Sequence, residues 1–97
     1  MKPTALVMDA ADNVATAIVT LRGGTAVRID VGGCVREVTV NEDIPFGFKF
    51  AIQHVKAGSA ITKYGETIGI ARVDIAPGSM VHVHNTDGAR GRGDLPH

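Results

Sequence analysis

Hydrophobic and polar residues alternate with a period of two through the middle of this chain, which is the spacing of a β-strand. Val27, Ile29 and Val31 alternate with charged residues, and a similar pattern returns over residues 34–40. Gly32 and Gly33 separate the two runs. Because two alternating runs joined by two such residues are typical of a β-hairpin, we predict a hairpin over residues 27–40.

Glycine-containing turns divide the second half of the chain into short strands, so we predict a mainly β fold. Residues 50–65 also align with residues 70–85 at a constant offset of 20, which pairs Val55 with Ile75 and Gly58-Ser59 with Gly78-Ser79. Two copies are too few for a solenoid. The repeat instead predicts a pseudo-symmetric β domain.

One stretch near the N-terminus has the spacing of a helix. Four apolar residues recur there at i, i+3, i+4 and i+7, namely Val14, Ala17, Ile18 and Leu21. Asp12 is placed to cap the first turn, and Gly23-Gly24 supply a stop. We therefore predict a short amphipathic N-terminal helix over residues 12–21.

Length and charge limit the functions that the chain can perform alone. The chain has 97 residues, enough for one domain but hardly for a deep active site of its own, so we expect a partner. Its formal net charge is +0, which disfavours nucleic-acid binding. Asp9 and Asp12 interrupt the early apolar stretches, so we predict neither a signal core nor a membrane span and expect a cytoplasmic protein. A single cysteine, Cys34, allows no internal disulfide and is interpreted as an ordinary strand residue.

Two histidines near the C-terminus are the first candidates for chemistry. If residues 80–84 are extended, Met80, His82 and His84 share one face of a strand. Two imidazoles on one face can bind a metal or an anionic ligand. Partly exposed strand histidines explain the pattern equally well, because no third ligand lies at a recognisable spacing.

Lys49, Lys63 and Tyr64 could bind a carboxylate, although lysines beside turns are usually solvated. His54 is interpreted as a surface loop residue and His97 as part of a mobile end. Residues 87–97 alternate glycine with charged residues and offer little to bury, which predicts a flexible tail or an arm that orders on a partner.

Several segments together resemble a known family. The segments "DNVATAIVTLRGG", "IPFGFKFAIQHVKAGSAITKYGETIGIARVDIAPG" and "VHVHN" are similar to the SAF domain at the start of altronate and galactarate dehydratases. They are also similar to the separately encoded small subunit of related hydro-lyases, including the sulfolactate sulfo-lyase small subunit. The resemblance implies a single β-clip domain over residues 1–86, followed by the tail.

The resemblance also implies a function and a site. The chain would be the accessory subunit of a metal-dependent hydro-lyase, working with a larger catalytic subunit on a small acidic substrate such as altronate. A divalent metal, iron in particular, would stabilise the intermediate and be held mainly by the larger subunit. The "H-x-HN" segment makes His82 and His84 the catalytic and metal-binding candidates. Substrate binding would fall to Asn85, Lys63, Tyr64 and Lys49. Phe48 stands where the family commonly has histidine.

Other functions remain open at this stage. Bisulfite elimination from sulfolactate is the first alternative, and a non-catalytic carbohydrate-binding or assembly module is the second. A third alternative is a self-sufficient enzyme with a private metal site at His82 and His84. Neither nucleic acid nor membrane is an expected partner, and the chain alone could form a homo-oligomer.

Overall fold

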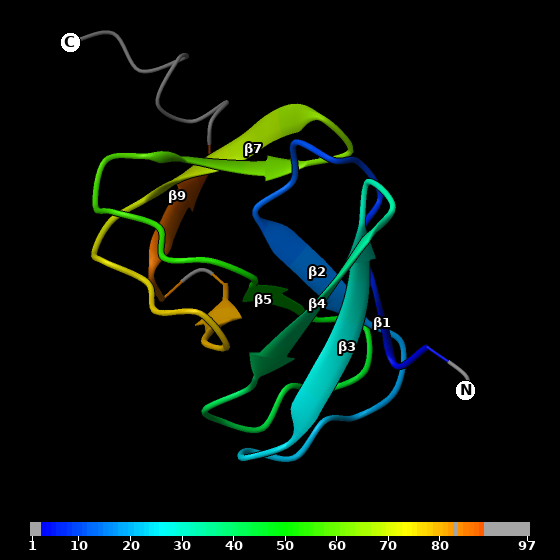
Figure 1. Cartoon of the computed structure of the whole chain (residues 1–97). Helices are drawn as coiled ribbons and strands as arrows, with labels where there is room; N and C mark the ends of the chain where they lie inside the picture. The colour runs from blue at the N-terminus through cyan, green and yellow to red at the C-terminus, as the bar shows by residue number, and fades with distance from the viewer. Residues whose placement is uncertain (1–2, 83, 89–97) are drawn as a thin grey trace, which may run out of the picture.

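The chain folds into short antiparallel β-strands in three small sheets (Figure 1). The structure is a computed structural model that describes residues 3–82 and 84–88. Within these residues the strands are β1 (Ala5–Leu6), β2 (Val14–Ala17), β3 (Ala26–Val31), β4 (Cys34–Thr39), β5 (Lys49–Ala51), β6 (Ala60–Lys63), β7 (Glu66–Ala71), β8 (Met80–Val81) and β9 (Thr86–Gly88). The sheet orders are β1-β2-β5-β8, β3-β4 and β6-β7-β9. The mainly β prediction is therefore confirmed.

The predicted N-terminal helix over residues 12–21 is wrong. Residues 14–17 form β2 instead, which pairs antiparallel with both β1 and β5. Val14, Ala15 and Ala17 are all buried, so this central strand is covered on both faces and need not alternate. The apolar residues that suggested a helical stripe thus belong to a strand and the segment after it. None of the described residues belongs to a helix, and in that part of the chain no helix could cross a membrane.

The predicted hairpin is confirmed and is made by β3 and β4. Its register runs from Ala26 opposite Thr39 to Val31 opposite Cys34. Gly32 and Gly33 form the turn with φ angles of 60° and 89°. Two successive positive φ angles define the type I′ turn, whose twist matches that of the flanking strands.

The predicted pseudo-symmetry is also confirmed, and it centres on the pair formed by Val55 and Ile75. Each N–H of this pair donates to the carbonyl oxygen of the other residue, at 2.9 and 2.8 Å. Three residues after each, Gly58 and Gly78 have φ angles of 88° and 89°. Their N–H groups make equivalent 2.8 Å hydrogen bonds across the pair. The repeated segments therefore form two matching turns around a local two-fold axis.

The same arrangement recurs in the first half of the chain, outside the repeat of residues 50–65 and 70–85. Leu21 and Ile44 exchange N–H to carbonyl hydrogen bonds of 2.8 and 2.7 Å. Gly24 and Gly47, three residues later, have φ angles of 93° and 86°. Positive φ at these positions is readily available only to glycine.

Two apolar clusters form the core. The larger packs the hairpin against β1, β2 and β5 and includes Phe50, which is fully buried. The smaller one lies around the Val55–Ile75 pair. In Figure 1, β2 and β5 lie between the β3–β4 hairpin and the β6-β7-β9 sheet. The strands of the second half surround the candidate site.

Candidate functional site

A depression of about 260 Å³ lies between the strands of the second half of the chain. Its lining residues come from β5, β6, β7 and β9, and from β8 with the residue after it: Lys49, Ile61, Ile68, Gly69, Val81, His82 and Thr86. Three of them are large aliphatic residues, and none carries a carboxylate. The depression is therefore an apolar hollow that holds one lysine and one histidine.

Lys49 is placed in the depression by the pairing of β5. It lies opposite Thr16 of β2 and opposite Val81 of β8, so its backbone is held on both sides. Burial lowers the pKa of Lys49 below its usual value of 10.5, and the nearby charge of Lys63 lowers it further. Within the described part of the chain, no carboxylate lies within ion-pair distance of Lys49.

Lys63 and Tyr64 lie at the turn between β6 and β7. The Lys63 Nζ atom is 5.0 Å from the centre of the exposed Tyr64 ring, which is the geometry of a cation–π contact. Tyr64 has a φ of 57°, which is uncommon for a residue other than glycine, and Gly65 follows with 73°. The turn therefore carries the ammonium group of Lys63 over the Tyr64 ring.

Asp12 holds this turn in place, although it was predicted to cap a helix. The residue is 4% exposed, and its carboxylate accepts hydrogen bonds from the N–H groups of Tyr64, Gly65 and Asp9 at 3.1, 2.9 and 3.1 Å. Three backbone donors satisfy a buried carboxylate that would otherwise be costly. Asp12 therefore caps a turn more than 50 residues away in the chain instead of a helix.

The two candidate histidines do not share a strand face, so that prediction is wrong. The strand β8 ends at Val81, and His84 and Asn85 lie in a turn. The N–H of Asn85 donates to the carbonyl of His82 at 3.1 Å, while its side-chain oxygen accepts from the N–H of His82 at 3.0 Å. The Asn85 amide group also donates to the Met80 carbonyl at 2.8 Å. Local side-chain hydrogen bonds of this kind compete with extended structure.

Asn13 is the counterpart of Asn85, and its side chain bonds to the first copy of the repeat. The side-chain oxygen of Asn13 accepts from Thr62 N–H at 2.8 Å, and its amide donates to Ala60 carbonyl at 2.9 Å. These partners precede His82 and Met80 by 20 residues each. Each asparagine side chain therefore makes the two backbone hydrogen bonds that a neighbouring strand would otherwise make. Asn85, predicted to bind substrate, has its carboxamide bonded to the backbone.

The imidazole of His82 packs against Phe48. The two ring centres are 5.0 Å apart and the rings are tilted by 49°. Phe48 itself packs on the larger core cluster, so the contact joins His82 to the rigid part of the domain. His84 is exposed and does not line the depression. In the described residues, no group of three His, Cys, Asp or Glu side chains could hold a metal ion.

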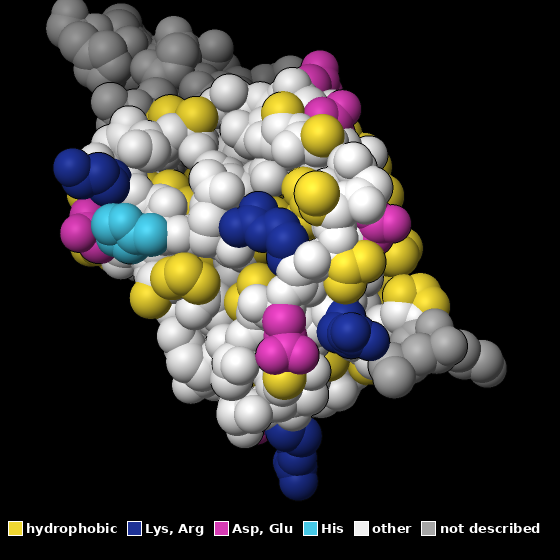
Figure 2. Space-filling model, viewed as in Figure 1, with side chains coloured by type: hydrophobic (Ala, Val, Ile, Leu, Met, Phe, Trp, Pro, Cys, Tyr) yellow, Lys and Arg dark blue, Asp and Glu magenta, His cyan; other side chains and the backbone are white. Residues whose placement is uncertain are grey.

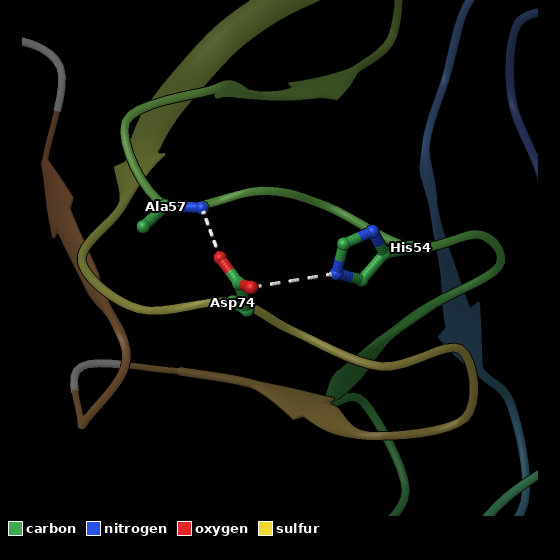
Figure 3. Close-up of polar contacts among 3 residues, drawn as sticks. All are labelled: His54, Ala57 and Asp74. Carbon is green, nitrogen blue, oxygen red and sulfur yellow. Dashed lines mark hydrogen bonds and ion pairs between the residues drawn. The ribbon is translucent and has the colours of Figure 1, made fainter.

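His54 is a surface residue, as predicted. Its Nε2 atom lies 3.8 Å from Asp74 Oδ2, and the other Asp74 oxygen accepts from Ala57 N–H at 2.8 Å (Figure 3). Both side chains are more than half exposed, so the pair contributes little to stability. The face shown in Figure 2 carries Lys and Arg side chains singly among acidic and hydrophobic ones. That face has no block of positive charge suited to nucleic acid.

Three known proteins and one family are similar to this chain. The family model described as the altronate/galactarate dehydratase SAF domain matches residues 3–89. Altronate dehydratase of Escherichia coli (strain K12) is 44% identical over 77 residues, which are 79% of this chain and 15% of that protein. Altronate dehydratase of Bacillus subtilis (strain 168) is 40% identical over 75 residues, covering 77% of this chain and 14% of that protein.

The third relative has a different name and a different coverage. The (2R)-sulfolactate sulfo-lyase subunit alpha of Paracoccus pantotrophus is 44% identical over 48 residues, which are 50% of this chain and 72% of that subunit. The chain therefore spans 14–15% of the altronate dehydratases that it matches but most of the length of this subunit.

Proposed function

Because the chain belongs to the altronate/galactarate dehydratase SAF domain family, we propose that it is the accessory subunit of a hydro-lyase. It would act on a sugar acid such as altronate or a related hydroxy acid, completing the active site of a larger catalytic subunit. The observation that carries this proposal is the extent of the matches. The matched region makes up only 14–15% of the altronate dehydratases. Most of the residues available for their activity therefore lie outside this domain.

The depression supports a role in binding the acid. Lys49 lies there without a carboxylate partner among the described residues, so its ammonium group is available to a substrate carboxylate. Removing a proton next to a carboxylate places negative charge on the carboxylate oxygens. In this proposal Lys49 stabilises that charge, and Lys63 adds to the positive potential.

His82 is the candidate for proton transfer, because it lines the same depression and imidazole exchanges protons near neutral pH. Phe48 and Asn85 position it through its ring and its backbone. His84, which faces solvent in this chain, would act only where a larger subunit covers the turn.

The divalent metal, iron in particular, would be held mainly by the larger subunit. The described residues do not fit a metal site on their own, since His82 and His84 lack a third ligand and do not share a strand face. A metal ion would supply electrophilic stabilisation of a developing oxyanion. This chain's own contribution would be to bind and orient the acid.

A second candidate function is the small subunit of a (2R)-sulfolactate sulfo-lyase. The match to 72% of a protein named as a subunit favours it, because the matched region makes up most of that relative. The two candidates differ in the leaving group, water in one and bisulfite in the other.

The decisive experiment is reconstitution. The tagged chain is purified from its own cells, the larger chain that accompanies it is identified, and the two are expressed separately and together. We expect 2-keto acid formation from altronate, or bisulfite release from sulfolactate, only with both chains. Lys49→Met should lower kcat/KM by roughly 100-fold, the scale of a lost charged contact, whereas the exposed Lys56→Met should not. Full activity of the larger chain alone would refute the proposal, and sugar-acid binding without any partner-dependent activity would favour a binding module.

A further inference from the structure

The β3–β4 and β6–β7 hairpins occupy equivalent places in the two halves of the domain. Each is enclosed by one of the two matching turn pairs described above. At the base of the first hairpin, Gly24 N–H donates to the Val40 carbonyl at 2.7 Å. At the base of the second, Gly58 N–H donates to the Ala71 carbonyl at 2.8 Å. The two hairpins can therefore be compared strand by strand, with β4 in the place of β7.

The outer edges of β4 and β7, which face away from their hairpin partners, are covered differently. The outer edge of β7 pairs antiparallel with β9, and the next residue, Arg72, donates its N–H to the Asn85 carbonyl at 2.9 Å. The matching bond in the first half runs from Asn41 N–H to the Gly78 carbonyl at 3.1 Å. After Gly78 the chain forms β8, which pairs with β5 and not with β4. Among the described residues β4 pairs only with β3, so its outer edge lacks the strand that β9 supplies to β7.

The outer edge of β4 presents backbone groups that can bind a strand. Val40 N–H bonds to the Thr25 carbonyl at 3.0 Å, so Val40 directs its backbone groups toward the first strand of the hairpin. Because this direction alternates along an antiparallel ladder, the N–H and C=O groups of Val35 and Glu37 point away from β3. The strand is six residues long, and Val35 is 65% exposed. A free edge of this length with an exposed β-branched residue is a template for pairing with another chain.

The charges of β4 decide against a second copy of this chain as the partner. The two longest antiparallel registers of β4 with itself that keep the outward groups bonded are centred on Arg36 and on Glu37. Each register places a residue directly opposite the same residue of the other copy. Like charges directly opposite each other destabilise a strand pair. The edge therefore fits a strand of different sequence.

We propose that the outer edge of β4 binds an extended segment of the larger catalytic chain, as an antiparallel strand in the place equivalent to β9. Charge complementarity requires a lysine or arginine opposite Glu37, an acidic residue opposite Arg36 and an apolar residue opposite Val35. The larger chain is the fitting source, because 85% or more of each matched altronate dehydratase lies outside this domain. This inference rests on the proposed function and adds the surface through which the two chains associate.

The test compares amide hydrogen exchange in the isotope-labelled full chain alone and in complex with the larger chain, by quenched-flow exchange and NMR. We expect the N–H groups of Val35 and Glu37 to exchange at least roughly 10-fold more slowly in the complex, as one added backbone hydrogen bond provides. The N–H groups of Arg36 and Val38, which face β3, are the internal control and should change less.

Val35→Lys should weaken association with the larger chain by roughly 10-fold or more, because a lysine at an edge opposes strand addition. Val73→Lys is the matched control, since Val73 is 53% exposed and lies outside β4. Both variants should keep the urea midpoint of the native chain, because each side chain is mostly exposed.

The outcomes separate this inference from the function on which it rests. Activity that requires both chains, without added protection at Val35 and Glu37, would overturn the docking edge and leave the proposed function intact. Full activity of the larger chain alone, with no association, would overturn both. An equal loss of affinity in Val35→Lys and Val73→Lys would overturn the assignment to β4. Protection that grows with the concentration of this chain alone would assign the edge to a second copy instead.

Discussion

Replacing Asn85 with alanine tests whether its carboxamide holds the turn that carries the two histidines. The residue is 6% exposed, and its side chain accepts a hydrogen bond from His82 N–H at 3.0 Å and donates one to the Met80 carbonyl at 2.8 Å. Alanine leaves both backbone groups without this partner. We expect the variant to lose stability and to release the backbone of His82.

The size of the effect follows from these two bonds. A buried group left unsatisfied costs about 1–3 kcal/mol. Met80 is half-buried and His82 is exposed, so water can replace part of what is lost. The lower part of the range therefore applies, and the two bonds together should contribute about 2 kcal/mol. With a typical urea dependence for a small protein, the midpoint of unfolding falls by about 1–2 M.

Asn13→Ala is the matched control, because the Asn13 side chain makes the same two kinds of hydrogen bond with the backbone of the first copy of the repeat. Urea unfolding followed by circular dichroism should show a similar loss of stability in both variants. Only Asn85→Ala should alter the NMR signals of the His82 imidazole, whose ring packs on Phe48 in the native turn. The reasoning is wrong if Asn85→Ala costs less than about 0.5 kcal/mol, the usual limit for an inconsequential surface change. It is also wrong if Asn13→Ala disturbs His82 as strongly.

Two further predictions concern a turn and a titrating group. Gly78→Ala should destabilise the fold by about 3 kcal/mol or more in thermal unfolding, because the added Cβ would overlap the carbonyl oxygen of Thr39. The control Gly58→Ala, which has a similar φ but open space around the added Cβ, should lose only about 1 kcal/mol. Equal losses in the two variants would contradict the role of the close approach to Thr39. Because burial and Lys63 lower the pKa of Lys49 from 10.5, the folded state binds fewer protons than the unfolded state between the lowered pKa and 10.5. The cost of charging Lys49 is therefore fully present at neutral pH and disappears as the pH rises through that window. Lys49→Met should be more stable than the native chain at pH 7, with an advantage that shrinks toward pH 10.5, and a pH-independent difference would contradict this account.

Local sequence patterns were sufficient to predict elements whose contacts are made within one short segment of the chain. The β3–β4 hairpin follows from alternation and from Gly32-Gly33, because both strands and the turn are adjacent in sequence. The repeat around Val55 and Ile75 was visible for the same reason, since its two copies share one spacing. The matching pair of Leu21 and Ile44 does not follow the 20-residue spacing, because the β3–β4 hairpin separates its halves.

The error at residues 12–21 shows what local patterns leave open. A short apolar run fits a helical stripe and a strand buried on both faces equally well. The strand is favoured over the helix because β1 and β5 supply hydrogen-bond partners on both sides of β2. The side chains of Asp12 and Asn13 likewise depend on contacts distant in sequence, because they cap backbone groups of residues 60–65 instead of a helix.

The mainly β class, the glycine turns and the family could be predicted from the sequence, because these depend on residue types at fixed local spacing. The sequence also named Lys49, Lys63, Tyr64, His82 and Asn85 as candidates. Which of these residues lie together depends on the tertiary fold. Lys49 and His82 line one depression because β5 pairs with β8. The carboxamide of Asn85 stabilises the turn after β8 through its hydrogen bonds to His82 N–H and the Met80 carbonyl. Pairing between distant strands and side-chain capping of distant backbone groups depend on contacts that no local window of sequence contains.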